Sequence, residues 1–260
     1  MSITDIIFEN VAAARQAGNF ISVVTVVYNR VSEIEATIAS ITNQTFQSFE
    51  YLIIDGGSTD GTLDVIKKYT DRITYWVSEP DKGIYDAMNK GAQRAKGEWI
   101  IFMNAGDLFY DGHVLESSAR TLAASTGKTI VYGDAEIVGI THPHIQHQKD
   151  RHLDLTKSII HQSIFTRTTF LQSNPYNTRY KVMADYDNLL SVSVVTPDKC
   201  LHIPEVICRY DKTGISSRPL YTYIREYYAI ARRRMRAKDF ISFNLYILPR
   251  LIWSFRLALT

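Results

Sequence analysis

The sequence predicts an α/β protein with a mostly parallel sheet flanked by helices. Over residues 21–107, apolar and β-branched strands alternate with helices, joined by short links. This alternation is typical of a doubly wound parallel sheet with right-handed crossovers. The links that follow the second, third and fourth strands are polar and carry Asp and Gly. Because ligands bind at the carboxyl ends of parallel strands, we expect these links to meet at one edge and form a binding site.

The first four strands are predicted at residues 21–27, 49–54, 73–77 and 98–103, each an apolar run between turn signals. Such runs are typical of strands covered on both faces. Helices are expected at about 31–42, 62–69, 84–95 and 114–124. Later strands are predicted at 129–138, 161–165 and 200–210, and a further helix begins near 183–187.

Length and composition indicate one large domain with an added element. The chain has 260 residues, of which 45% are hydrophobic and 22% charged, ordinary values for a globular protein. The two cysteines, Cys200 and Cys208, are too few for a disulfide framework. Their even spacing predicts that both lie on one face of a strand as buried hydrophobes. No signal peptide or membrane span is recognisable, so we expect a cytoplasmic protein, either free or peripheral on the inner face of the cell membrane.

Three regions are predicted: a helical appendage at 1–18, the α/β domain at 19–218, and an amphipathic helical extension at 219–260. The extension is basic and aromatic, and its cations are Arg225, Arg232, Arg233, Arg234, Arg236 and Lys238. It either lies on an anionic membrane surface or packs on the core with its basic face in water, and liposome flotation distinguishes the two. No nucleic-acid-binding module is recognisable, so nucleic acid is not an expected partner.

Two strand-end loops carry candidate functional acids. Asp107 ends the fourth strand beside Gly106, and a carboxylate there can hold a divalent cation against a phosphate. Alternatively, Asn104 and Asp107 only close a turn and cap the next helix. Asp55 ends the second strand and can accept hydrogen bonds from a base or a ribose. No G-x-G-x-x-G follows the first strand, which argues against a dinucleotide-dependent oxidoreductase.

Taken in order, five motifs resemble those of the family 2 glycosyltransferases, inverting enzymes of the GT-A fold. They lie at residues 23–29, 54–62, 79–91, 97–98 with 104–107, and 184–187. The resemblance spans about residues 20–217. It is strongest to small bacterial polysaccharide and lipopolysaccharide transferases in which glycine replaces the second acid of an Asp-Asp-Gly-Ser motif. The resemblance implies a Rossmann-like, nucleotide-binding sheet.

The resemblance also implies roles for individual residues. Asp185 matches the catalytic base, and Asp107 matches the acid that ligates Mn²⁺ or Mg²⁺ on the diphosphate. Asp55 matches the acid that contacts the nucleotide base, and His161 lies near the active site. The remaining residues that it assigns to the nucleotide-sugar pocket are Tyr28, Asn29, Gly57, Asp81, Lys82, Gly83, Asn89, Asn104, Ala105 and Gly106.

The chain departs from the family pattern at Asn104 and Gly106, where many relatives have acids. Asp107 is left as the lone carboxylate of that motif, which bears on metal dependence. Asp187 is the rival candidate for the base, but it cannot share a helical face with Asp185, so only one of the two can point into the cleft. The family match favours Asp185, and Asp187 is expected to cap a helix or pair with a surface cation.

The activity implied is inverting transfer of a sugar from a nucleotide-diphosphate sugar, first of all a UDP-sugar, to a hydroxyl of a saccharide or lipid-linked acceptor. Such a reaction would belong to the synthesis of surface polysaccharide or glycolipid. The alternative is a catalytically weak nucleotide-sugar-binding or scaffolding subunit of a glycan-assembly complex. Tight donor binding without turnover across many acceptors would favour this alternative.

Overall fold

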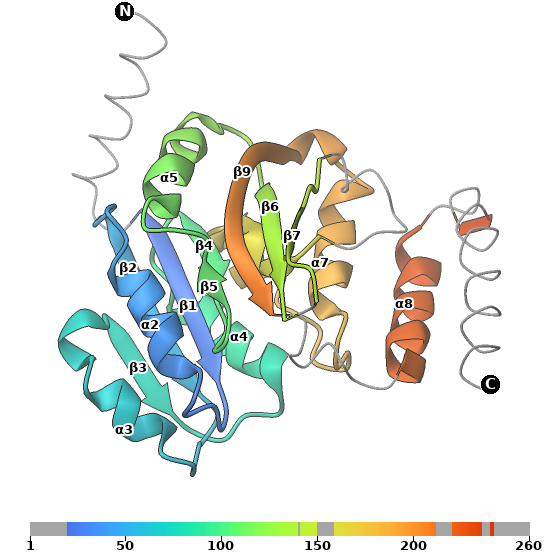
Figure 1. The fold of residues 1–260 in the computed structure, drawn as a ribbon. Helices are drawn as coiled ribbons and strands as arrows, with labels where there is room; N and C mark the ends of the chain where they lie inside the picture. Colours follow the sequence, from blue (N-terminus) through green and yellow to red (C-terminus); the bar gives the residue numbers. More distant parts are fainter. Residues whose placement is uncertain (1–19, 140, 150–158, 212–219, 236–239, 242–260) are drawn as a thin grey trace, which may run out of the picture.

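A computed structural model describes residues 20–139, 141–149, 159–211, 220–235 and 240–241. The predicted appendage at 1–18 and most of the segment after residue 235 lie outside these ranges. The described strands form one sheet in the order β3-β2-β1-β4-β8-β6-β9-β5, with β7 paired to β6. Figure 1 shows helices on both sides of this sheet.

The first half of the sheet is parallel, as predicted. β1 (Ile21–Val27) lies between β2 (Phe49–Asp55) and β4 (Trp99–Phe102), and β3 (Tyr75–Ser78) pairs with the outer side of β2. Every residue of β1 is buried. Its side chains alternate between two hydrophobic clusters, one on each face of the sheet. This double burial explains why the strand is apolar almost throughout.

Two groups of helices cover this half. α2 (Ile34–Thr42), α3 (Thr62–Lys67) and α5 (Val114–Ala124) pack on one face. α4 (Ile84–Arg94), α6 (Thr168–Ser173) and the start of α7 (Ala184–Ser193) pack on the other. Short 3₁₀ turns occur at Thr70–Arg72, His161–Ser163 and Pro197–Lys199.

The second half of the sheet is mixed. Its strands are β5 (Leu108–Phe109), β6 (Ile130–Val138), β7 (His144–Gln146), β8 (Ile164–Arg167) and β9 (Cys200–Asp211). β8 runs antiparallel to both β4 and β6, whereas β9 runs parallel to β6. The prediction of a strand over 161–165 is wrong in its first part, because residues 161–163 form a 3₁₀ turn and the strand begins at Ile164.

The prediction for the two cysteines is half right. Both are buried, but they belong to different hydrophobic clusters. Cys200 pairs with Ile130 and Cys208 with Ala135, so eight steps along β9 match five along β6. The irregularities in this ladder therefore give β9 an odd number of extra residues relative to β6. Because side chains alternate along a strand, the two thiols end on opposite faces.

The described part of the C-terminal extension packs on the core. α8 (Leu220–Arg234) buries Tyr227, Ile230 and Ala231 against α7. Arg233 and Arg234 both bind the buried carboxylate of Asp187, which confirms the predicted pairing of that acid with surface cations.

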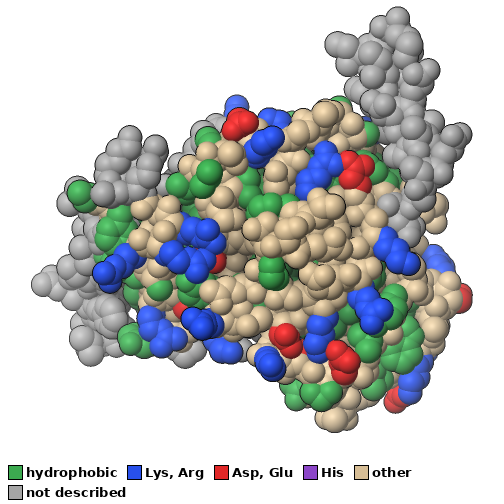
Figure 2. All heavy atoms as spheres, turned by 180° about the vertical axis from the view of Figure 1, so that it is seen from behind, with side chains coloured by type: hydrophobic (Ala, Val, Ile, Leu, Met, Phe, Trp, Pro, Cys, Tyr) green, Lys and Arg blue, Asp and Glu red, His purple; other side chains and the backbone are tan. Residues whose placement is uncertain are grey.

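Basic side chains are not confined to α8. Figure 2, a view from behind, shows Lys and Arg side chains spread over that whole face. Within the described ranges, no helix has the length and apolar character needed to cross a bilayer. Contact of the extension with a membrane surface stays a prediction.

Gly97, at the turn into β4, provides a test of the fold. A Cβ at this position would lie 2.6 Å from the backbone nitrogen of Ser22 and 2.7 Å from the carbonyl carbon of Ile21. We expect Gly97→Ala to force β1 and β4 apart and to lower the free energy of unfolding by about 1–3 kcal/mol in urea titrations. Gly112→Ala is the matched control, because its Cβ would meet Asn43 at an ordinary 3.6 Å. Equal stability of the two variants would contradict this account.

Candidate active site

Asp185, in the first turn of α7, is held by two side chains from distant segments. The Tyr85 hydroxyl on α4 donates a hydrogen bond of 2.8 Å to Asp185 Oδ1. His161 Nδ1, in the 3₁₀ turn before β8, lies 3.5 Å from Asp185 Oδ2. The side chain of Asp185 is only 16% exposed. A nearly buried carboxylate in a fixed orientation is thus presented beside an imidazole.

The same 3₁₀ turn contacts the loop after β4. His161 Nε2 lies 3.0 Å from the amide nitrogen of Asn104. The next residue, Gln162, donates from Nε2 to Asp107 Oδ2 at 2.7 Å. The structure therefore brings four of the predicted site residues together: Asn104, Asp107, His161 and Asp185.

The pKa values of His161, Asp185 and Tyr85 are shifted by one another's charges and by burial. Burial alone would lower the pKa of His161, but the hydrogen bond and charge of Asp185, together with the charge of Asp107, outweigh it and raise that pKa above its ordinary value. Burial likewise pushes the pKa of Asp185 upward, but the hydrogen bonds and charge of its neighbours, His161 foremost, leave it lowered. Burial and the charge of Asp185 raise the pKa of Tyr85 well above its ordinary value. Asp185 is therefore ionised at neutral pH.

The loop of Asn104–Asp107 is shaped by backbone contacts to its neighbours. Ala105 N donates to the Val26 carbonyl of β1. Gly106 has φ +102° and donates to Thr37 Oγ1, which in turn donates to the Asp107 carbonyl. The positive φ explains the glycine. The alternative that Asp107 caps the next helix is wrong, because β5 follows directly and α5 begins only at Val114.

The site offers oxygen ligands of the kind that Mg²⁺ and Mn²⁺ prefer. Asn104 Oδ1 and Gln162 Oε1 are buried and find no hydrogen-bond partner among the described residues. Both belong to side chains that adjoin Asp107 or His161. No group of three or more His, Cys, Asp and Glu side chains suited to a metal occurs within the described ranges. One carboxylate with two amide oxygens fits a cation that completes its shell with substrate phosphate oxygens.

Asp55 is engaged within its own loop. It is fully buried and accepts hydrogen bonds from the backbone N–H groups of Gly57 and Ser58 at 3.0 and 2.9 Å. It also accepts from the hydroxyls of Ser58 and Ser78. In this conformation Asp55 fixes the Gly-rich loop, in which Gly57 has φ +83°. Its contact with a nucleotide base stays a prediction.

Tyr28 and Asp81 converge over the backbone of Gly56. A Cβ on Gly56 would lie 2.4 Å from Asp81 Oδ2 and 3.4 Å from the Tyr28 ring. Tyr28 is 61% exposed. An exposed aromatic ring beside a carboxylate forms a surface on which a planar base can stack.

The remaining predicted residues of this region shape the loops. Asn29, with φ +50°, accepts a hydrogen bond from Thr59 N. Gly83 has φ +124° and donates to Asp81 Oδ1, and Lys82 beside it is exposed.

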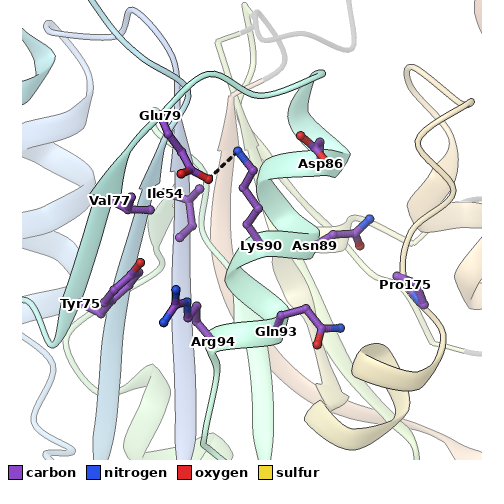
Figure 3. Close-up of a pocket in the computed structure, with 10 residues that line it drawn as sticks. All are labelled: Ile54, Tyr75, Val77, Glu79, Asp86, Asn89, Lys90, Gln93, Arg94 and Pro175. Atoms are coloured by element: carbon purple, nitrogen blue, oxygen red, sulfur yellow. Dashed lines mark ion pairs between the residues drawn. The ribbon is translucent and has the colours of Figure 1, made fainter.

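Asn89 lies apart from these residues. Both ends of its amide bind the backbone of Tyr176, at 2.9 and 2.8 Å. It lines a separate cavity of about 390 Å³ between β3 and α4. Figure 3 shows Asn89 on α4 in this cavity, opposite Pro175, with the Lys90–Glu79 ion pair nearby. Its assignment to the nucleotide-sugar pocket stays a prediction that this geometry does not support.

Sequence reasoning missed two buried side chains that bind the segments carrying His161 and Asp185. Gln148 is fully buried, accepts from Ile160 N at 2.7 Å and donates to Ser163 Oγ at 2.6 Å, so it bridges the turn that carries His161. Glu226 on α8 accepts from the backbone N–H groups of Lys181 and Val182, just before α7. Neither has a local sequence signal. Tyr85, by contrast, lies within the motif at 79–91 and could have been singled out.

Comparison with known proteins agrees with this geometry. The sequence model of "Glycosyl transferase family 2" matches residues 22–184. A "PGL/p-HBAD biosynthesis glycosyltransferase" of Mycobacterium bovis (strain BCG / Pasteur 1173P2) is 32% identical over 206 residues, covering 77% of each chain.

Solved structures share the fold at low identity. S. aureus TarS 1-349 in complex with UDP-GlcNAc has a TM-score of 0.69 at 16% identity, covering 86% of this chain and 72% of its own. The mannosyltransferase PcManGT from Pyrobaculum calidifontis, in complex with GDP-Man and Mn²⁺, has a TM-score of 0.62 at 17% identity, covering 90% and 75%. With the GT-A fold and the family match both in place, the chain belongs to glycosyl transferase family 2 and is a glycosyltransferase.

Proposed function

We propose that the chain transfers a sugar, with inversion, from a nucleotide-diphosphate sugar to an acceptor hydroxyl, and that Asp185 is the general base. The observation that carries this proposal is the ionised, nearly buried carboxylate of Asp185, fixed by Tyr85 and His161 beside the loop of Asn104–Asp107. A general base must be ionised and held within reach of the proton that it takes. The lowered pKa of Asp185 supports the first condition. Its contacts with Tyr85 and His161 support the second, because they fix the orientation of the carboxylate.

The proposed step is a single displacement. The acceptor oxygen attacks the anomeric carbon while its proton passes to the Asp185 carboxylate. The bond from that carbon to the diphosphate breaks, and its electron pair leaves with the nucleoside diphosphate. Attack opposite the leaving group inverts the configuration. His161, with its raised pKa, steadies the Asp185 charge before the proton arrives.

The donor side is formed by the strand-end loops. Tyr28 and Asp81 would hold the base, and the loop of Asn104–Asp107 would face the diphosphate. Mn²⁺ or Mg²⁺ would be held by Asp107 with the amide oxygens of Asn104 and Gln162, and would neutralise the leaving diphosphate. One solved neighbour is a complex with UDP-GlcNAc and another a complex with GDP-Man and Mn²⁺, which supports a nucleotide-sugar donor.

The acceptor is a saccharide or a lipid-linked group in the synthesis of surface polysaccharide or glycolipid. The name of the Mycobacterium bovis relative, a biosynthetic glycosyltransferase, supports this assignment. A lipid-linked acceptor would bring the protein to the inner face of the cell membrane.

Replacement of Asp185 tests the base. With a donor found by thermal shift among UDP-, GDP- and dTDP-sugars in the presence of Mn²⁺, we expect Asp185→Asn to lower turnover by about 10²–10⁴-fold. Donor binding should be retained, because no donor-side loop is altered. Asp64→Asn, on an acid that is 81% exposed on α3, is the control. Unimpaired turnover in Asp185→Asn would remove this residue as base.

The histidine titration tests the ion pair. We expect the pKa of His161, followed by NMR of its ring protons, to lie above that of an exposed histidine and to fall below it in Asp185→Asn, where burial dominates. Because the folded-state pKa is raised, His161 stabilises the fold fully below its unfolded pKa and loses that contribution as pH rises through the folded value. An unchanged His161 titration in the variant would contradict the pairing.

Metal binding tests the role of Asp107. We expect Asp107→Asn to weaken Mn²⁺ binding in the presence of UDP by about tenfold or more, measured by calorimetry, because it removes the carboxylate but keeps its shape. Asp111→Asn, on an exposed acid in the loop before α5, should bind Mn²⁺ like the wild type. Equal affinities in the two variants would exclude Asp107 as a ligand.

A further inference from the structure

Asn89, in the middle of α4, joins this helix to the segment between α6 and α7. Its side-chain amide donates from Nδ2 to the Tyr176 carbonyl at 2.9 Å, and its Oδ1 accepts from Tyr176 N at 2.8 Å. An amide that donates to and accepts from the same residue fixes both the position and the direction of that backbone. The segment held in this way leads directly into α7, whose first turn carries Asp185.

The ring of Tyr176 connects this contact to the side chains around Asp185. Tyr176 is buried, and its ring packs against that of Tyr85 with centroids 5.6 Å apart and an interplanar angle of 44°. It also meets the ring of Phe102, at the end of β4, at 5.9 Å and 64°. Tilted and edge arrangements at these distances are favourable for aromatic pairs. Tyr176 therefore fills the space beside the Tyr85 ring and restricts its movement.

Tyr85 carries the connection to the proposed base. It lies one helical turn before Asn89, so the two side chains leave α4 on the same side. Its hydroxyl donates to Asp185 Oδ1 at 2.8 Å. Asp185 also lies close to Tyr176, because burial and the charge of that carboxylate raise the pKa of the Tyr176 hydroxyl. The amide, the two rings and the carboxylate thus form one contiguous group between α4 and α7.

We propose that Asn89 is a positioning residue, which fixes the carboxylate of Asp185 through Tyr176 and Tyr85 and does not contact the nucleotide sugar. The inference rests on the proposed function, because it concerns the base of the same site. It gives Asn89 a role different from the one that the family resemblance implies. The cavity that Asn89 lines agrees with this role, because its lining includes neither Asp185 nor the loop of Asn104–Asp107.

The role has a kinetic consequence. A misplacement of about 1 Å can lower turnover about 10²-fold even when its cause lies far from the reaction. Loss of the Asn89 amide removes two hydrogen bonds from the Tyr176 backbone and loosens the support of the Tyr85 ring. The loops that would hold the donor keep their contacts. We therefore expect slower turnover at unchanged donor affinity.

The variant Asn89→Ala separates this role from contact with the nucleotide. We expect its affinity for UDP in the presence of Mn²⁺, measured by calorimetry, to equal that of the wild type within about twofold, whereas loss of a nucleotide contact would weaken binding about tenfold. With the nucleotide sugar that most raises the melting temperature, kcat for donor hydrolysis should fall about tenfold and KM should not change. Gln93→Ala is the matched control, because Gln93 lies one turn further along α4 and donates to the Gln172 carbonyl of α6.

A double-mutant cycle with Tyr85→Phe tests whether the effect passes through that tyrosine. We expect Tyr85→Phe also to lower kcat, and the double variant to lie within about twofold of the more impaired single variant. Effects that multiply would contradict action through Tyr85. A role in global stability alone would lower the melting temperature of Asn89→Ala and leave kcat unchanged at temperatures where the variant is folded.

Hydrogen exchange, followed by mass spectrometry, tests the connection without any donor. We expect Asn89→Ala to raise exchange about tenfold both around Tyr176 and in the first turn of α7, and Gln93→Ala to leave both unchanged. Weakened UDP binding, unchanged kcat or unchanged exchange in that turn of α7 in Asn89→Ala overturns the inference and leaves the proposed function in place. Failure of every nucleotide sugar to bind or react counts against the proposed function, whereas the exchange result is read independently.

Discussion

The antiparallel pairing of β8 with β4 is the constraint on which the site depends. Trp99 pairs with Arg167 and Ile100 with Thr166, so the end of β4 lies beside the beginning of β8. The loop after β4 and the 3₁₀ turn before β8 must then meet. This register is the reason why Asn104 reaches His161 across 57 residues of sequence. A parallel strand in the position of β8 would present its far end there.

Two further contacts hold the segments of His161 and Asp185 from outside the candidate site. Gln148 bridges the backbone of Ile160 and the hydroxyl of Ser163, so the His161 turn has little freedom. Glu226 binds the segment before Asp185 and joins it to α8, which is also attached through the Asp187 ion pairs. Both acceptors are buried, and leaving their backbone N–H partners unpaired would cost free energy. α8 therefore helps to support the candidate site, and its Arg233 and Arg234 stabilise the fold through Asp187.

The parts of the fold that follow from local pattern could be predicted from sequence. The boundaries of β1 and α5 follow from apolar runs and their breaks. Asp107 and Asp185 could be found because strand ends and family motifs mark them. The 3₁₀ turn at His161 could not, because Ile164 and Phe165 favour a strand, whereas the turn is held by contacts with Gln148 and Asp107 that have no local sequence signal. The opposite faces of Cys200 and Cys208 depend on ladder irregularities that leave no sequence signal. Asn89 lies within the motif at residues 79–91, but both ends of its side-chain amide form hydrogen bonds with the backbone of Tyr176.

The departure at position 104 has a chemical consequence for the His161–Asp185 pair. A neutral His161 that donates from Nδ1 to Asp185 has a lone pair at Nε2, and the Asn104 amide nitrogen can donate to it. A protonated ring donates from Nε2 instead, and the same amide can turn its oxygen toward it. An asparagine at position 104 can therefore hydrogen-bond to His161 in either protonation state. An aspartate could hydrogen-bond only to the protonated ring, and its charge would raise the pKa of His161 further. With the ring neutral, Asn104 Oδ1 stays free of the histidine and has no hydrogen-bond partner among the described residues, which leaves it available to the proposed cation. The amide at position 104 therefore links the loop after β4 to the proton state of the His161–Asp185 pair.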